Sequence, residues 1–158
     1  MNVVTHGFAP IAAIALVELV MVKTRGRRLL ENKHYAAIAI AGAAPDLLYP
    51  HLSLHARYNS WTHTLWFALG FVPVALIVTR WLFPAMQKRC GLLMIWAMSL
   101  HLFCDGIAGG IAWLYPFSDH VIGKYYVYPR NWITIDIFCL ATFVVCFWGL
   151  KFAPRSQL

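Results

Sequence analysis

The acidic residues of this chain lie where a solvated surface would not place them. Of its six acidic side chains, five fall in or next to apolar stretches: Glu18, Asp46, Asp105, Asp119 and Asp136. An ionisable group inside a membrane span costs roughly 2.5–3.5 kcal/mol on insertion scales, so it normally faces a partner, a cavity or a metal ion. These carboxylates are therefore the first candidates for chemistry.

His101 and Asp105, within the run SLHLFCDGIAGG, are the pair whose spacing points most specifically to a shared site. A spacing of four residues puts both side chains on one face of a helix, where they can bind a common ion or hydrogen-bond each other. The alternative is a buried His–Asp hydrogen bond that only fixes helix packing.

Four separate segments supply a wider set of candidate metal ligands: His6, Asp46, His63, His101 and Asp105. The topology derived below brings all of them toward one face of the membrane. Three imidazoles and two carboxylates suit a divalent metal, with zinc the first choice and manganese or iron as alternatives. The set can hold one ion or share two.

The elements that position these residues are apolar runs. The chain is 61% hydrophobic and only 12% charged, whereas soluble domains are about a quarter charged. We expect an all-α, polytopic membrane helical bundle of four to five helices, formed as a single integral membrane domain over residues 1–158. The runs are 8–22, 34–48, 61–83, 91–115 and 132–152, and Pro45 is expected to end or kink the second.

Lysines and arginines set the orientation of these runs. If every run crosses and the 23–33 loop is cytoplasmic, ten basic residues lie on that side: Lys23, Arg25, Arg27, Arg28, Lys33, Arg80, Lys88, Arg89, Lys151 and Arg155. The other side keeps Arg57, Lys124 and Arg130. The positive-inside rule then puts the candidate ligands at the non-cytoplasmic face. The basic residues act as topology signals, and we expect no nucleic-acid partner.

Several residues of the outer loops are candidates for supporting roles. His51 and His55 are possible further ligands or proton carriers, and we assign His55 with Asp46 and Asp105 to proton transfer. Arg57, Lys124 and Arg130 are on the correct side to hold a phosphate.

Three other polar residues receive structural predictions. Asp136, near the outer end of the last run, is expected either to contact a ligand histidine or to interact with its helix N-terminus. Glu18 is expected to pair with the basic cluster that follows it, and His34 to lie on the cytoplasmic surface.

The motifs also occur in a recognisable order. They are Thr5-His6, Pro45-Asp46, Trp61-Thr62-His63-Thr64, His101-x-x-x-Asp105-Gly106 and Tyr115-Pro116. This order resembles the family of LexA-regulated, inner-membrane-associated, metal-dependent hydrolases, over roughly residues 5–118. It is more distantly similar to the zinc-dependent phospholipase C and P1-nuclease group. The chain departs from the first family at Leu48, where a second Asp is common, and at Tyr58-Asn59, where a His-Arg pair is common.

The resemblance implies a multi-pass protein of the bacterial inner membrane. It implies a hydrolase of esters or phosphoesters, with membrane lipids or small molecules as substrates and His6, Asp46, His63, His101 and Asp105 as metal ligands. Two alternatives stay open. One is a non-enzymatic protein for metal binding or for ion or proton transport, and the other is an assembly factor that uses its His–Asp pairs only for packing. The sequence predicts no oligomeric state.

Overall fold

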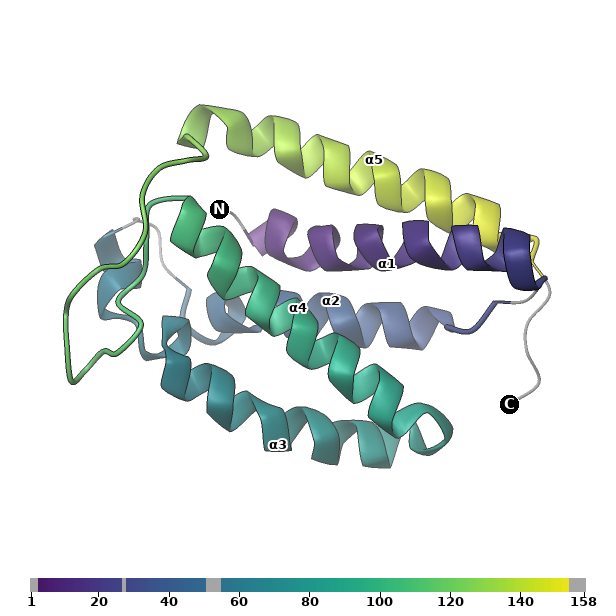
Figure 1. Cartoon of the computed structure of the whole chain (residues 1–158), viewed down its shortest axis with the longest axis horizontal. Coiled ribbons are helices and arrows are strands. Elements are labelled where there is room, and N and C mark those ends of the chain that lie inside the picture. Colours follow the sequence, from purple (N-terminus) through teal and green to yellow (C-terminus); the bar gives the residue numbers. More distant parts are fainter. Residues whose placement is uncertain (1–2, 27, 51–54, 154–158) are drawn as a thin grey trace.

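The computed structural model describes residues 3–26, 28–50 and 55–153, and it is helical (Figure 1). The α-helices are α1 (Val3–Arg25), α2 (Asn32–Leu48), α3 (Leu65–Leu82), α4 (Gln87–Ile107) and α5 (Trp132–Lys151). Short 3₁₀ turns occur at His55–Asn59 (η1), Trp61–His63 (η2), Pro84–Met86 (η3) and Pro129–Asn131 (η4). The predicted all-α membrane bundle is therefore confirmed.

Four of these helical segments are long and apolar enough to cross a bilayer. They are Val3–Arg25, Leu65–Leu82, Pro84–Ile107 and Pro129–Lys151. The helix α2 has only 17 residues, which at 1.5 Å per residue gives a length of about 26 Å, short of the roughly 30 Å of a hydrocarbon core. By itself α2 is therefore shorter than the hydrocarbon core of a bilayer.

The helices run alternately up and down, and α2 lies between α1 and α4 (Figure 1). On the outside, α5 packs against α1 and α3 packs against α4. In the spans of α1 and α4, 44% of residues are buried, against 11% in α3 and α5. The flanking helices α3 and α5 therefore present most of their surface to lipid.

One expected helix boundary was wrong. The second run ends at Leu48 as expected, and Pro45 lies inside α2 without ending it. The run 91–115 does not stay helical, because α4 ends at Ile107 and the chain turns at Gly109 and Gly110, whose φ angles are +121° and +90°. These left-handed conformations favour glycine, because a Cβ would clash there.

The segment after α4 folds back over the end of the bundle. Isolated antiparallel bridges join Ala108 to Tyr125 and Ile111 to Ile122. A Cβ on Gly109 would lie 2.8 Å from the Tyr125 ring, so the tyrosine packs directly on the backbone. This segment covers the bundle end where α1 and α5 begin and where α2 and α4 finish (Figure 1).

Close contact between α1 and α2 depends on a small residue. A Cβ built on Gly42 would lie 2.4 Å from the carbonyl oxygen of His6 and 3.0 Å from Cγ of Pro10. Only glycine allows the two backbones to approach this closely, as small residues do generally between membrane helices. The contact fixes the start of α1 against the end of α2.

Candidate metal centre

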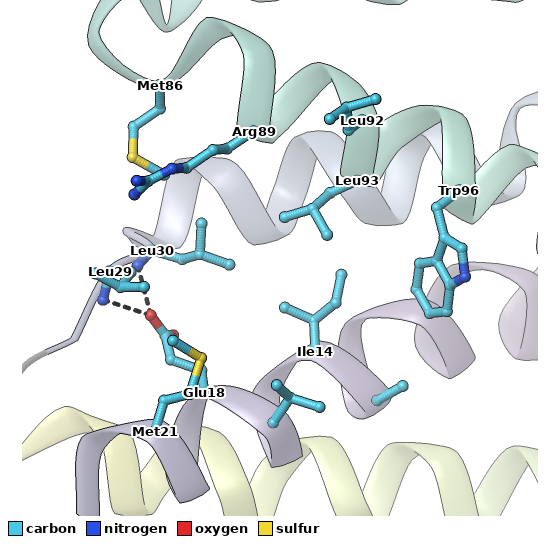
Figure 2. Close-up of a pocket in the computed structure, with 12 residues that line it drawn as sticks. Ile14, Glu18, Met21, Leu29, Leu30, Met86, Arg89, Leu92, Leu93 and Trp96 are labelled. Atoms are coloured by element: carbon cyan, nitrogen blue, oxygen red, sulfur yellow. Dashed lines mark hydrogen bonds between the residues drawn. The ribbon is translucent and has the colours of Figure 1, made fainter. Parts of the chain in front are cut away.

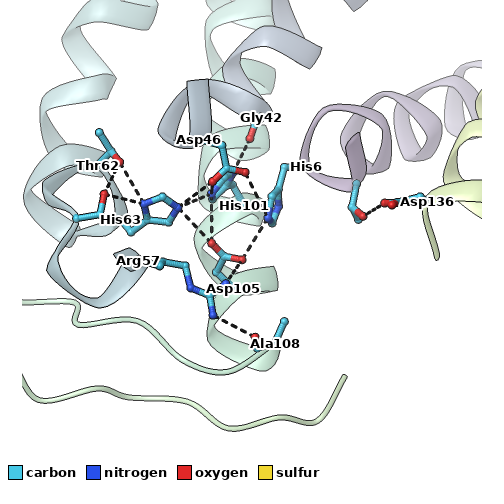
Figure 3. Close-up of polar contacts among 12 residues, drawn as sticks. His6, Gly42, Asp46, Arg57, Thr62, His63, His101, Asp105, Ala108 and Asp136 are labelled. Carbon is cyan, nitrogen blue, oxygen red and sulfur yellow. Dashed lines mark hydrogen bonds and ion pairs between the residues drawn. The ribbon is translucent and has the colours of Figure 1, made fainter. Parts of the chain in front are cut away.

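The predicted ligands come from helix ends that meet at one end of the bundle. His6 lies near the start of α1, Asp46 near the end of α2, and His63 in η2 just before α3. His101 and Asp105 lie in the final turns of α4. Each of these five residues is at most 5% exposed, and their polar groups point toward one another (Figure 3).

Four of these residues form a compact cluster. Asp46, His63, His101 and Asp105 each offer a ligand atom, and these four atoms all lie within 4.8 Å of one another. Nε2 of His63 is 3.2 Å from Oδ1 of Asp46 and 3.3 Å from Oδ2 of Asp105. Nε2 of His101 is 3.8 Å and 3.4 Å from the same two oxygens. The cluster therefore joins α2, η2 and α4.

His6 adds a third imidazole at the edge of this cluster. Its Nε2 lies 3.2 Å from Oδ1 of Asp105 and 4.0 Å from Oδ2 of Asp46. Its ring stacks on that of His101, with centroids 3.7 Å apart. The first helix of the chain thus closes the cluster from the side opposite His63.

Hydrogen bonds to the outer ring nitrogens aim two of the imidazoles inward. Nδ1 of His101 lies 2.7 Å from the carbonyl oxygen of Gly42, which can only accept, so Nδ1 carries the proton and the neutral ring directs a lone pair on Nε2 into the cluster. Nδ1 of His63 lies 3.1 Å from the hydroxyls of Ser60 and Thr62. Nε2 of His63 and Nε2 of His101 are only 3.2 Å apart.

Arg57 is the cation that faces the cluster from η1. Its Nη1 donates to Oδ1 of Asp105 at 2.7 Å, and its Nη2 donates to the carbonyl oxygen of Ala108 at 3.1 Å. Two carboxylates and one guanidinium leave one net negative charge on the buried cluster when the imidazoles are neutral. The cluster therefore attracts a further cation.

The ionisation of His63 reflects the same attraction. Burial disfavours its charged form, but hydrogen bonds and charges from Asp105 and Asp46 outweigh burial and raise its pKa. The carboxylates that draw a proton to His63 would equally draw a metal ion to the same point.

The spacing of the donors fits a metal. Four ligands held about 2.1 Å from an ion in a tetrahedron lie roughly 3.4 Å from one another. The contacts of His63 and His101 with the two carboxylates run from 3.2 to 3.8 Å. Imidazole and carboxylate donors suit zinc and also manganese or iron. The four-residue cluster could thus hold a metal ion.

The structure places the remaining predicted loop residues in several environments. Lys124 is exposed in the segment that pairs with the end of α4, and Arg130 is exposed in η4 with its guanidinium 5.4 Å from the Tyr128 ring. Neither has a contact with the cluster among the described residues. His51 lies outside the described residues, and so does the side chain of His55.

Two of the structural predictions have clear outcomes. Glu18 is buried and lies 3.6 Å from Nε of Arg28, which agrees with the expected ion pair. The surface role expected for His34 was wrong, because His34 is only 2% exposed. Its Nδ1 accepts a hydrogen bond from the backbone N–H of Glu31 at 2.9 Å and caps α2.

Asp136 supports the cluster through a neighbour of a ligand. It accepts a hydrogen bond from the hydroxyl of Thr5, which precedes His6 (Figure 3). The bond ties α5 to the start of α1. Asp136 therefore contacts the residue before a predicted ligand, and this contact with Thr5 was not among the two that the sequence led us to expect.

Sequence reasoning missed the supporting groups of two ligands. The Gly42 carbonyl could not be foreseen, because any residue carries one and only the packing of α2 on α4 selects it. Ser60 and Thr62 were detectable in principle, since hydroxyls that flank a candidate ligand are frequent partners of its second ring nitrogen.

Comparison with known proteins identifies a family for this chain. A family model described as YdjM inner membrane protein matches residues 1–156, which is nearly the whole chain. Neither the curated proteins nor the solved structures contain a significant match. Together with the four candidate spans, the family match establishes an inner membrane location.

Proposed function

The chain belongs to the YdjM inner membrane protein family, and from this premise we propose that it is a membrane-embedded, metal-dependent hydrolase. Its substrate is an ester or phosphoester, with a phospholipid as the first candidate. The observation that carries the proposal is the convergence of buried imidazoles and carboxylates on one point. The hydrolase activity, and with it the expected control by LexA, comes from the resemblance of the ordered motifs.

The metal in this proposal is zinc, held by Asp46, His63, His101 and Asp105, with His6 adjacent. When bound, the ion supplies Lewis acidity that activates water and stabilises negative charge on the scissile group. The chain supplies the orientation of the ligands, since the Gly42 carbonyl fixes the His101 ring and Arg57 fixes the Asp105 carboxylate.

The two carboxylates then take different roles. Asp105 is 1% exposed and held by Arg57, whereas Asp46 is 5% exposed. Oδ1 of Asp46 faces His63 and His101, so we assign its other oxygen, Oδ2, as the group that accepts the proton of the attacking water. The proton-transfer role of His55 and the phosphate contacts of Lys124 and Arg130 stay predictions within this scheme. The phosphate contact expected of Arg57 also stays a prediction, and it would compete with the bonds of Arg57 to Asp105 and Ala108.

A cavity lined by sequence neighbours of two ligands supports a lipid substrate. It has a volume of about 490 Å³ and is lined mainly by apolar residues at the start of α3, together with Leu48 and Tyr115-Pro116. Leu48 is two residues from Asp46, and Thr64, also in the lining, directly follows His63, so the segments that carry two of the ligands also line this cavity. An acyl chain fits this lining, with its headgroup ester directed toward the cluster.

The basic residues orient the site in the membrane. Lys23, Arg25, Lys88, Arg89 and Lys151 lie at helix ends far from the cluster (Figure 1). By the positive-inside rule that end is cytoplasmic, so the proposed site faces the non-cytoplasmic side.

Ion transport is less well supported, because a transport path needs polar groups across the bundle. Between the cluster and the buried Glu18, the buried core residues of α1, α2 and α4 are apolar: Ile11, Ala15, Ile38, Ala41, Met94 and Ala97. Flux of a divalent ion into proteoliposomes would favour transport over hydrolysis.

Metal binding is tested with His101→Ala and a matched control, His34→Ala. Both substitutions remove a buried imidazole that bonds to the backbone, so each costs about 1–3 kcal/mol in folding. Only His101→Ala removes a cluster donor. We expect elemental analysis of purified protein to find one equivalent of metal in the wild type and in His34→Ala, and far less in His101→Ala.

Hydrolysis is tested on the same preparations. Metal-loaded wild type and His34→Ala should release product from phospholipid in mixed micelles or from a chromogenic phosphodiester, whereas Asp46→Asn should retain metal better than it retains activity. Metal-loaded protein that is inactive on broad panels of esters and phosphodiesters would refute the enzyme and leave the metal site standing.

A further inference from the structure

A second cavity lies between α1 and α4, toward the end of the bundle opposite the metal cluster. Its volume is about 570 Å³, and its lining is apolar apart from Glu18 and Arg89. Figure 2 shows Arg89 and Glu18 near one end of this cavity and Trp96 at the other. The groove opens between two membrane-spanning helices, so in a bilayer its contents come from the lipid phase.

The acidic residue of the groove is fully engaged by the protein. Glu18 accepts hydrogen bonds from the backbone N–H groups of Leu29 and Leu30, at 2.6 and 2.5 Å, and from the Tyr35 hydroxyl at 2.6 Å. Arg28, itself 4% exposed, balances its charge from 3.6 Å. Glu18 therefore closes the end of the groove as part of the fold and adds no net negative charge to it.

Arg89 is the cation that the groove presents to a ligand. It is exposed, and within the described ranges it takes part in no ion pair. On α4 it begins a stripe that continues through Leu92 and Leu93 to Trp96, at the spacing that puts residues on one helix face. The stripe runs from a cation to an apolar surface over roughly 10 Å of helix.

We propose that this groove binds one anionic phospholipid of the cytoplasmic leaflet. The lipid phosphate contacts Arg89, and an acyl chain lies against the leucines of α4 and Ile14 of α1. The placement agrees with the orientation above, because Arg89 lies at the basic end of the bundle and anionic lipids attract basic residues there. The bound lipid is distinct from the proposed substrate, which enters at the other end.

The lining favours a lipid over a helix of another protein. Membrane helices associate through small residues that let backbones approach, whereas this groove is lined mainly by Leu, Ile, Met and Trp. Flexible acyl chains fill such an irregular apolar surface without requiring close backbone contact. A second copy of the chain in the groove is therefore the competing outcome of the test.

Native mass spectrometry of the detergent-solubilised full chain tests the proposal. Phosphatidylglycerol, which is anionic, and phosphatidylcholine, which is zwitterionic, are titrated separately into wild type, Arg89→Gln and Lys88→Gln. Lys88 is the matched control, since it is exposed beside Arg89, does not line the groove and carries the same charge. One basic residue contributes about 1 kcal/mol to anionic lipid binding, which corresponds to roughly fivefold in affinity.

The wild type should bind one phosphatidylglycerol at least about fivefold more tightly than phosphatidylcholine. Arg89→Gln should abolish this preference and Lys88→Gln should keep it. A third variant, Ala13→Phe, adds bulk to the apolar lining of the groove and should weaken binding of both lipids. Equal binding of the two lipids by wild type, equal loss in both charge variants, or a dimer that Ala13→Phe dissociates would overturn the proposal. None of these readouts requires hydrolytic activity.

Discussion

A single methyl group placed on Gly42 should disturb the metal cluster without touching a ligand side chain. In Gly42→Ala the new Cβ would lie 2.4 Å from the His6 carbonyl oxygen, whereas real Cβ atoms stay at 3.0 Å or beyond. The backbones of α1 and α2 must therefore move apart by at least 0.6 Å, the difference between these two distances. The strain falls on the backbones of His6 and residue 42. The carbonyl oxygen of residue 42 is the group that bonds Nδ1 of His101.

The energetic cost follows from the same geometry. Overpacking costs about 1–3 kcal/mol, and alanine recovers up to about 1 kcal/mol through its helix propensity. Gly70→Ala is the matched control, because it gains the same propensity in α3 and its Cβ meets nothing within 4 Å. Gly42→Ala should therefore be about 1–3 kcal/mol less stable than Gly70→Ala.

The assay is unfolding of both variants in detergent, followed by a titration with zinc. Displacing two ligands through their backbone supports should weaken metal binding about 10–100-fold in Gly42→Ala, as loss of supporting contacts does in other metal sites. Gly70→Ala should bind metal as the wild type does. If the two variants are equally stable and bind zinc equally well, close packing of α1 on α2 does not position the ligands.

Two further substitutions test the two ends of the bundle separately. Glu18→Leu leaves the N–H groups of Leu29 and Leu30 and the buried Arg28 without their acceptor, so unfolding in detergent should show a loss of about 3–5 kcal/mol, with metal content unchanged. Arg57→Met removes the cation beside Asp105 and should destabilise metal-free protein by about 3–5 kcal/mol. Added zinc should recover part of that loss, because it supplies positive charge to the same carboxylate, and melting curves with and without zinc measure the recovery. A deficit in Arg57→Met that zinc leaves unchanged would contradict a metal at this position.

The sequence predicted the helices correctly where the length of an apolar run is enough to identify a membrane span. The runs 61–83 and 132–152, which contain α3 and α5, gave correct spans because a membrane helix needs about 20 apolar residues. The run 8–22 is shorter than α1, which extends over Val3–Arg25 and is long enough to cross. The end of α4 was missed, because residues 108–115 are as apolar as a span and yet leave the helix at Gly109 and Gly110. These apolar residues cover the end of the bundle. Sequence hydropathy cannot distinguish residues that cover a bundle end from residues that face lipid.

The candidate site was predictable because charge inside an apolar run is costly. That cost singled out five acidic residues, and two of them, Asp46 and Asp105, lie in the cluster. The expected topology brought His6 and His63 to the same end. Charge was misleading for His34, whose basic neighbours suggested a surface position although it is buried and caps α2. Contacts that depend on packing, such as the one between His101 and Gly42, required coordinates.

The shortness of α2 has a consequence for how the protein enters the membrane. A helix of 17 residues with a buried aspartate inserts poorly by itself, yet its two ends must reach opposite faces of the bundle for the ligands to meet. Its contact with α1 at Gly42 provides the necessary partner. We therefore expect α2 to insert together with α1 as a helical hairpin, so that α2 packs on α1 from the start.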